Sequence, residues 1–219
     1  MPPFTAMNIT VIGHGSVGGT LATEWANAGH DITIGARKPS GDAAQHLSQT
    51  VGITVTTISE SLSHPEVILV AVPAHAGIEV ADQIASAGPG PDTVLIDATN
   101  AVGAGPDPYE TVADALQARV NGAQVVKAFN TTGAENMADP DYGGDRLDMF
   151  MAGSDDDAKA ITASLASDAG FGACYDVGDP SFFASLEHLA RIWISLAVTQ
   201  GHGRDIGFKL LHRQDASRA

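Results

Sequence analysis

Residues 13–18, Gly-His-Gly-Ser-Val-Gly, have the types and spacing of a turn that binds phosphate. The turn follows a short apolar run at residues 8–12 and precedes residues 16–28, in which apolar side chains recur at helical spacing. A glycine turn between a strand and a helix binds a pyrophosphate, because the helix presents unpaired N–H groups and the positive end of its dipole. The pattern predicts a dinucleotide-binding site.

Each glycine of this turn has an expected role. We expect Gly13 to make the tight turn, Gly15 to let the backbone approach the pyrophosphate, and Gly18 to let the helix pack closely on the strand. The predicted phosphate contacts come from Gly13, His14, Gly15, Ser16, Val17 and Gly18. For the imidazole of His14, two interpretations stay open: it donates to a phosphate, or it faces solvent.

Arg37 and Lys38 are the only basic residues among the first 118, which carry twelve acidic ones. They follow the run Asp-Ile-Thr-Ile-Gly at 31–35, about 20 residues beyond the turn, where a dinucleotide-binding fold meets the adenosine ribose. An acidic residue there binds the 2′-hydroxyl of NAD, whereas an arginine accommodates the 2′-phosphate of NADP. The alternative is a pair of solvated residues at a strand end. Their isolation favours NADP, with Arg37 forking onto phosphate oxygens and Lys38 adding a point charge.

Three loops are expected at the nicotinamide end of the site. Ligands of open α/β sheets bind beyond the carboxyl ends of the strands, where the strand order reverses. The segments that leave the fourth, fifth and sixth expected strands are 72–75, 97–100 and 129–134. The predicted contacts are Val72, Pro73, Thr99, Asn100, Asn130 and Ala134. The two asparagines either hydrogen-bond the carboxamide or a ribose, or cap the turns that follow them.

No general acid or base is evident in the sequence, so no catalytic side chain is predicted. Lys127 precedes a candidate loop, but its place in an apolar strand is compatible with a side chain that points away. Glu187 and Arg191 stand four residues apart and are predicted to form a surface ion pair on a helix. Trp193 is expected in the core or at a dimer contact.

Helices and strands are expected to alternate along the first part of the chain. The expected strands are residues 8–12, 32–35, 53–57, 67–72, 93–97 and 124–129. The expected helices are residues 16–28, 41–49, a segment ending near 87, and 107–120, the last with Asp107 as N-cap and Pro108 in first position. This alternation predicts an α/β protein with a Rossmann-type, doubly wound parallel sheet.

The alternation continues more loosely beyond residue 147. We expect strands at 147–151 and 173–177, a helix at 155–169, and a last helix from Asp179-Pro180 to Thr199. These elements would extend the same sheet and fold a helix back across it. The predicted division is a disordered tail at 1–6, an NADP-binding Rossmann domain at 7–131, and a small C-terminal α/β extension at 132–219 with the acceptor site and dimer contacts.

Composition narrows the classes of partner. The chain has 219 residues and a formal charge of −15, which argues against nucleic acid and anionic membrane surfaces as partners. No apolar stretch approaches a membrane span, and the first residues lack the features of a signal peptide. The single cysteine, Cys174, excludes a Cys-cluster metal site. We expect a cytoplasmic protein without a metal site.

Several motifs together resemble the NADPH-dependent coenzyme F420 reductases, a family that includes the F420H2:NADP oxidoreductases and is related to the cytosolic domains of STEAP metalloreductases. The motifs are residues 11–18, Ile34-Gly35-Ala36-Arg37, Val-Lys-Ala-Phe-Asn-Thr-Thr-Gly-Ala-Glu-Asn-Met at 126–137, and Gly-Phe-Lys-Leu-Leu at 207–211. The resemblance extends from Met7 to Leu211. It implies a homodimer and direct hydride transfer between the nicotinamide and a deazaflavin or flavin ring, a reaction that needs positioning rather than an acid.

The residues leave the identity of the acceptor open. Deazaflavin enzymes of the family carry Ser where this chain has Ala36, and the archaeal ones carry His where it has Asn130. Reductases of imines, pyrroline carboxylate or β-hydroxy acids begin with similar nucleotide domains, but they carry a longer helical domain than the roughly 88 residues that follow residue 131 here. Two more hypotheses are a flavin or ferric reductase and a non-catalytic NADP-binding module that senses redox state.

Overall fold

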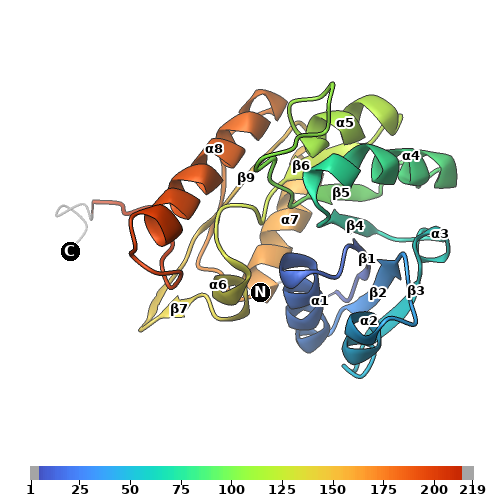
Figure 1. Ribbon diagram of the computed structural model, residues 1–219, viewed down its shortest axis with the longest axis horizontal. Helices are drawn as coiled ribbons and strands as arrows, with labels where there is room; N and C mark the ends of the chain where they lie inside the picture. The colour runs from blue at the N-terminus through green and yellow to red at the C-terminus, as the bar shows by residue number, and fades with distance from the viewer. Residues whose placement is uncertain (1–4, 214–219) are drawn as a thin grey trace.

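The structure is a computed structural model that describes residues 5–213, so the predicted disorder of residues 1–4 lies outside the described residues. Eight strands form one sheet in the order β10-β9-β6-β5-β4-β1-β2-β3 (Figure 1). The strands are β1 (Asn8–Ile12), β2 (Asp31–Ala36), β3 (Ile53–Thr57), β4 (Val67–Val70), β5 (Val94–Asp97), β6 (Gln124–Lys127), β9 (Met149–Gly153) and β10 (Cys174–Asp176). A two-stranded hairpin, β7 (Asp141–Tyr142) and β8 (Asp145–Arg146), stands apart from this sheet.

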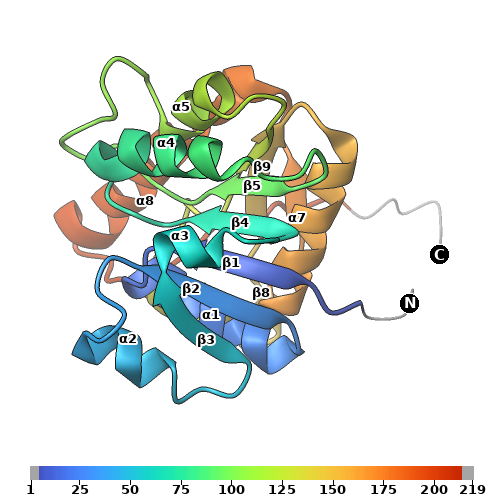
Figure 2. The ribbon, with the colours of Figure 1, turned by 90° about the vertical axis from the view of Figure 1, so that its right-hand side faces the viewer.

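Helices cover both faces of the sheet (Figures 1 and 2). They are α1 (Ser16–Ala28), α2 (Asp42–Leu47), α3 (Ile58–Ser61), α4 (Gly77–Ala87), α5 (Val112–Arg119), α6 (Ala134–Ala138), α7 (Asp156–Asp168) and α8 (Phe183–Ile194). Leu21 of α1 and Leu165 of α7 pack with the side chains of one face, and Ile84 of α4 and Phe183 of α8 pack with those of the other. The central strand β4 is wholly buried, which explains its uninterrupted apolar sequence.

The predicted Rossmann-type fold is confirmed, and so is the extension of the sheet by the C-terminal elements. Strands β1 to β6 pair in parallel, so their carboxyl ends share one edge of the sheet. Strand β9 departs from the expected parallel arrangement, because Lys127 of β6 pairs with Ala152 of β9 in antiparallel register. The division into two domains at residue 131 stays a prediction.

The predicted start of the helix at 107–120 is wrong. Helix α5 begins only at Val112, and Thr111 is its N-cap. The hydroxyl of Thr111 accepts from the backbone N–H of Asp114, and the Asp114 carboxylate accepts from the Thr111 N–H. This reciprocal capping box satisfies two unpaired donors at once and outweighs the weaker signal of Asp107-Pro108.

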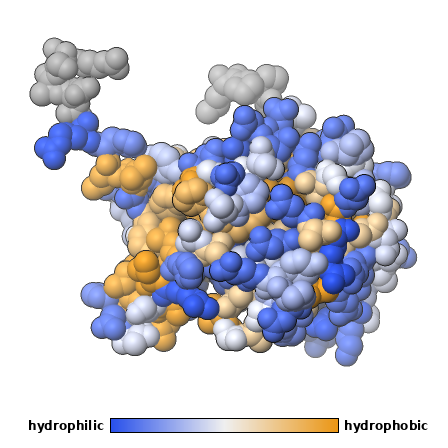
Figure 3. Space-filling model, turned by 90° about the horizontal axis from the view of Figure 1, so that it is seen from above, coloured by the Kyte–Doolittle hydropathy of each residue, from blue (hydrophilic) through white to orange (hydrophobic). Residues whose placement is uncertain are grey.

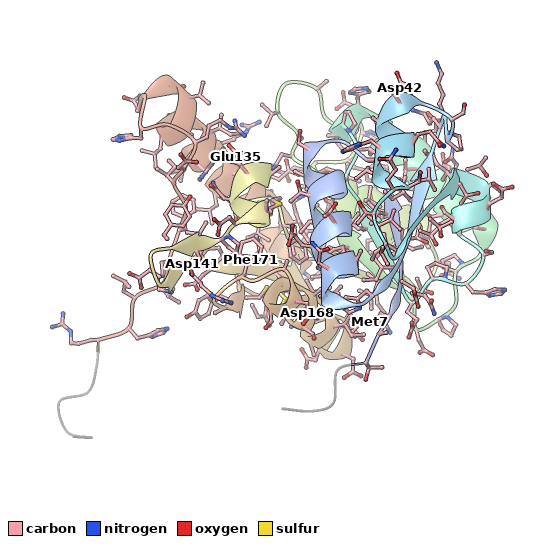
Figure 4. The ribbon with its side chains drawn as sticks, turned by 90° about the horizontal axis from the view of Figure 1, so that it is seen from below. Met7, Asp42, Glu135, Asp141, Asp168 and Phe171 are labelled. Carbon is pink, nitrogen blue, oxygen red and sulfur yellow. The ribbon has the colours of Figure 1, made fainter. Side chains whose placement is uncertain are left out.

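Two side-chain hydrogen bonds fasten segments near the two ends of the described chain. His30, buried just before β2, accepts at Nδ1 from the Met7 N–H and faces Asp168 at 3.3 Å through Nε2; Figure 4 shows Met7 and Asp168 side by side. Toward the C-terminus, the indole of Trp193 on α8 donates to the Ile206 carbonyl at 2.6 Å. Trp193 is therefore a buried core residue, one of its two predicted roles. Among the described residues, no helix is long and apolar enough to cross a bilayer.

Candidate functional site

The glycine turn follows β1 and has the geometry that its sequence predicted. Gly13 has a φ of +101°, a conformation that favours glycine, and a Cβ there would overlap the carbonyl oxygen of Ala71 beside β4. A Cβ at Gly18 would overlap the carbonyl oxygen of Gly13, so the helix can approach the turn only through glycine. Around Gly15 the space is open, with no atom within 4 Å of a Cβ placed there. The turn is compact inside and open on the side of Gly15.

The amino end of α1 offers unpaired donors beside this turn. Its N-cap, Gly15, has no side chain to accept from the first-turn N–H groups, and no acidic residue stands in that turn. Helices α5 and α7 instead begin with side-chain caps, from Thr111 and Asp155. Ser16 is exposed, and His14 is half-buried. The first turn of α1 therefore has the properties of an anion site.

We predict that Gly18→Ala lowers the free energy of unfolding by about 1–3 kcal/mol, because the added methyl group must displace the backbone of the turn. Gly15→Ala is the matched control: it meets no protein atom, and the φ of −73° at Gly15 suits alanine. Chemical denaturation of both variants would measure the difference. Equal stability losses would contradict the role assigned to Gly18.

Arg37 and Lys38 follow the end of β2 and are both exposed. Neither side chain forms an ion pair with any residue between 5 and 213. Other cations are neutralised: Arg119 lies 2.6 Å from Asp82, and Lys159 lies 2.8 Å from Asp176. The positive charge of Arg37 and Lys38 is thus available to a ligand.

The remaining predicted residues lie in the loops that follow β4, β5 and β6 or, for Ala134, at the start of the helix after β6. Val72 is half-buried, Pro73 is exposed, and Ala134 is the first residue of α6 and buried. Figure 4 shows Asp42 and Glu135 on opposite sides of α1. Asp42 is the first residue of α2, a few residues after Arg37, and Glu135 follows Ala134 on α6. The loops after β1, β2, β4, β5 and β6 leave the same edge of the sheet, as the parallel pairing requires.

Asn100 and Asn130 bond to each other rather than capping the following turns. The Asn100 amide donates to the backbone carbonyl of Asn130 at 2.8 Å, and the Asn130 amide donates to Asn100 Oδ1 at 3.0 Å. These two bonds fix the orientation of both amides. They leave Asn130 Oδ1 buried with no hydrogen-bond partner in the structure, and the buried hydroxyl of Thr99 has none either.

Buried polar atoms normally have partners, because a lost hydrogen bond in the interior costs about 1–3 kcal/mol. Asn130 and Thr99 are each only 3% exposed. Asn130 Oδ1 can accept, and the Thr99 hydroxyl can donate or accept. This chemistry suits a ligand carboxamide, which offers both a donor and an acceptor.

Phe129 introduces a backbone strain just before Asn130. Its φ of 58° is unusual for a bulky residue, yet its side chain is fully buried. The ring packs edge to face against Trp25 at 5.5 Å and lies 6.3 Å from Phe171. Aromatic packing on the α1 side of the sheet therefore holds a strained loop, a feature that often marks functional sites.

A buried ion cluster behind the loops is the main feature that the sequence interpretation missed. Lys127 is fully buried, and its Nζ lies 2.7 Å from Asp97 Oδ2, 2.9 Å from Glu187 Oε1 and 3.0 Å from the Thr99 carbonyl oxygen. Burial opposes the charged form of the lysine, but the carboxylates of Asp97 and Glu187 outweigh it and raise the pKa of Lys127 above its usual value. We name these three residues the ion cluster.

The predicted surface pair between Glu187 and Arg191 is wrong. Glu187 is buried and pairs with Lys127, while Arg191 donates to the Ala101 carbonyl at 3.3 Å. The Lys127 side chain likewise does not point away from the loops. One signal was present in the sequence: Asp97 and Lys127, of opposite charge, end two neighbouring strands that are otherwise nearly all apolar, and they face each other in register.

The sequence of this region matches a known family. Residues 8–101 match the sequence profile of the family described as NADP oxidoreductase, coenzyme F420-dependent. No curated protein matches the chain by sequence.

Solved structures extend the likeness over nearly the whole chain. A candidate F420-dependent NADP reductase from Arthrobacter sp. FB24 is 28% identical and has a TM-score of 0.80, with 94% of this chain and 100% of that chain covered. The hypothetical protein SMa0349 from Sinorhizobium meliloti shares the fold at 24% identity and a TM-score of 0.66, covering 95% and 97%.

A reductive aminase from Aspergillus terreus, solved with NADPH and ethyl levulinate, shares the fold at 20% identity and a TM-score of 0.64. It covers 90% of this chain, but this chain spans only 63% of that longer protein. The family resemblance predicted from the motifs is therefore confirmed: the chain matches the coenzyme F420-dependent NADP oxidoreductases over residues 8–101, and over nearly its whole length it has the fold of a candidate reductase of that kind.

Proposed function

We propose that this protein is an NADP(H)-dependent oxidoreductase that transfers a hydride between NADPH and a flat redox ring, a deazaflavin such as coenzyme F420 or, as second choice, a flavin. The observation that carries the proposal is Arg37, which follows β2 on the edge of the sheet that also holds the glycine turn and forms no ion pair with any of residues 5–213. A cytoplasmic location belongs to the same proposal.

The described residues fit a dinucleotide from end to end. The first turn of α1 would bind the pyrophosphate through its free N–H groups. Arg37, with Lys38 beside it, would bind the 2′-phosphate. Asn130 Oδ1 and the Thr99 hydroxyl lack partners and would bind the carboxamide of the nicotinamide. Val72 and Pro73 would lie against the ring, and Ala134 offers only a small side chain where α6 begins.

Bound NADPH supplies the hydride from its nicotinamide ring, so the protein itself does not need to supply an acid. Lys127 is not a candidate acid, because its ammonium donates to Asp97 and to the Thr99 carbonyl and forms an ion pair with Glu187. The chain's part is to hold the two rings in contact and to keep water out, which can contribute several kcal/mol of rate enhancement.

The direct test is NADPH oxidation by the purified protein, followed by its absorbance, with coenzyme F420, FMN, FAD and ferric chelates offered in parallel and NADH as control. Turnover with F420 alone would support the deazaflavin acceptor. Turnover only with flavins or ferric chelates would favour a flavin or ferric reductase. NADPH binding without reduction of any acceptor would favour a non-catalytic redox-sensing module.

We also propose a homodimer. Exposed apolar side chains gather at α8 and the C-terminal segment, where Figure 3 shows an apolar surface; they are Ile192, Val198, Leu210 and Leu211. A carboxylate placed in a dimer contact would be desolvated without a partner, so Ile192→Glu is predicted to give a monomer in analytical ultracentrifugation.

The matched control is Val51→Glu, an exposed valine on the loop before β3, far along the chain from α8. It is expected to sediment like the wild type. A monomeric wild type, or the same change in both variants, would contradict the dimer contact.

A further inference from the structure

The ion cluster holds the backbone on both sides of Asn100. Asp97 Oδ1 accepts from the Thr99 N–H at 2.9 Å, and Lys127 Nζ donates to the Thr99 carbonyl at 3.0 Å. Glu187 Oε2 accepts from the Ala101 N–H at 2.8 Å. The polar backbone groups that flank Asn100 are thus bonded to buried charges, which make stronger hydrogen bonds than neutral groups do.

Stability alone does not explain such a cluster. The side chains of Asp97 and Lys127 are fully buried, and that of Glu187 is 9% exposed. Removing charges from water has a large desolvation cost, and well-packed apolar residues in place of buried ion groups are often equally stable or more stable. What apolar residues cannot do is fix the direction of three backbone hydrogen bonds.

The fixed backbone around Asn100 determines which atom of Asn130 is available to a ligand. With its backbone held, the Asn100 side chain bonds to Asn130 twice, and these bonds use the Asn130 carbonyl and amide group. The one polar side-chain atom of Asn130 that stays free is its Oδ1. We propose that the ion cluster of Asp97, Lys127 and Glu187 is a positioning device for the nicotinamide end of the dinucleotide site, acting through Asn100 on Asn130 Oδ1 and through the Thr99 backbone on its hydroxyl. This inference rests on the proposed function.

The cluster also makes α8 part of the nucleotide site. Asp97 and Lys127 come from β5 and β6, but Glu187 comes from α8, which lies beside β9 (Figure 1). Arg191, one helical turn later, donates to the Ala101 carbonyl. The C-terminal helix α8 thereby helps to fix the conformation of the loop after β5. A shift of α8 would therefore move the backbone beside Asn100 and change the proposed nicotinamide contacts.

The test compares two ligands that share one end. In the proposed site NADPH would extend over the whole length, whereas adenosine 2′,5′-bisphosphate would extend only from Arg37 to the glycine turn. For Lys127→Met and Glu187→Gln, we expect NADPH affinity in calorimetry to fall about 10-fold, as for the loss of one or two hydrogen bonds. The affinity for the bisphosphate is expected to stay unchanged, and hydride transfer to fall about 100-fold through misplacement of the ring.

Glu187→Gln keeps the size of the side chain and removes only its charge, so it tests the proposal even if Lys127→Met does not fold. Lys159→Met is the control, because Lys159 also contacts two carboxylates, Asp156 and Asp176, but near the surface on α7. It is expected to bind both ligands like the wild type.

The outcomes separate the two proposals. Equal losses for NADPH and for the bisphosphate, or no loss for either, would overturn the positioning role and leave the proposed function standing. A wild type that binds the bisphosphate no better than adenosine, and does not bind NADPH, would overturn both. A selective loss of NADPH affinity in both cluster variants, absent from Lys159→Met, would support the positioning role.

Discussion

Lys127→Met is expected to lower the free energy of unfolding by about 3–5 kcal/mol, because it leaves two buried carboxylates without their cation. In this variant Asp97 would still accept a hydrogen bond from the Thr99 N–H, and Glu187 would still accept one from the Ala101 N–H. Neither N–H group carries a charge, so neither can neutralise the carboxylate. Urea denaturation followed by circular dichroism measures the loss. Lys159→Met, which removes a lysine near the surface, is expected to cost about 0–1 kcal/mol.

A triple variant separates charge from packing. Asp97→Leu, Lys127→Met and Glu187→Leu together remove every charge of the cluster, so much of the stability lost in Lys127→Met is expected to return. The proposed nicotinamide positioning would not return with it, because the triple variant also loses the hydrogen bonds that Asp97 and Glu187 accept from the Thr99 and Ala101 N–H groups. A triple variant as unstable as Lys127→Met would contradict this explanation of the cluster's energetics.

The pH dependence of the Lys127 contribution has a definite sign. Because the folded state raises the pKa of Lys127 above its ordinary value of 10.5, the stabilisation is complete below that value. It is lost as the pH rises through the higher folded-state pKa. The stability difference between wild type and Lys127→Met is therefore expected to be constant through the neutral range and to shrink only in strong alkali.

Local sequence patterns predicted most of the elements that build the proposed phosphate end of the candidate site. Strand β1 and helix α1 have the predicted bounds, and Gly29 ends α1 at a φ of 101° as its type suggests. These elements are specified by apolar periodicity and by glycine, which act within a few residues of the chain. The antiparallel pairing of β9 is different, because it depends on a partner strand more than 20 residues earlier.

The proposed nicotinamide end of the candidate site could be predicted from the sequence only as a set of loops. The direction of the Lys127 side chain depends on Asp97 in a neighbouring strand and on Glu187, which lies 60 residues later in the sequence. Helical spacing alone favoured Arg191 as the partner of Glu187. The fold instead buries Glu187 against the sheet. A buried carboxylate needs a cation in the interior, and Lys127 is the cation within reach.

Arg37→Asp is expected to reverse the choice of nicotinamide cofactor. Losing hydrogen bonds from a charged donor costs about 1.5–3 kcal/mol, and repulsion of the 2′-phosphate adds to it, so we expect NADPH to bind about 100-fold more weakly. NADH is expected to bind more tightly than to the wild type, because an aspartate at this position can accept from the ribose 2′-hydroxyl. Calorimetric titration with both cofactors measures the reversal.

Two further variants show whether the effect belongs to the guanidinium or to net charge. Lys38→Asp introduces the same charge change one residue later and is expected to weaken NADPH binding less, because an ammonium cannot fork onto phosphate oxygens. Arg146→Asp makes this charge change on the exposed hairpin strand β8 and is expected to leave binding unchanged at moderate salt, where distant charges are screened. Equal losses of NADPH and NADH affinity in Arg37→Asp would mean that the residue supports the loop rather than selecting the cofactor. A selective loss of NADPH affinity would assign the 2′-phosphate to Arg37, which follows β2 on the edge of the sheet that holds the glycine turn.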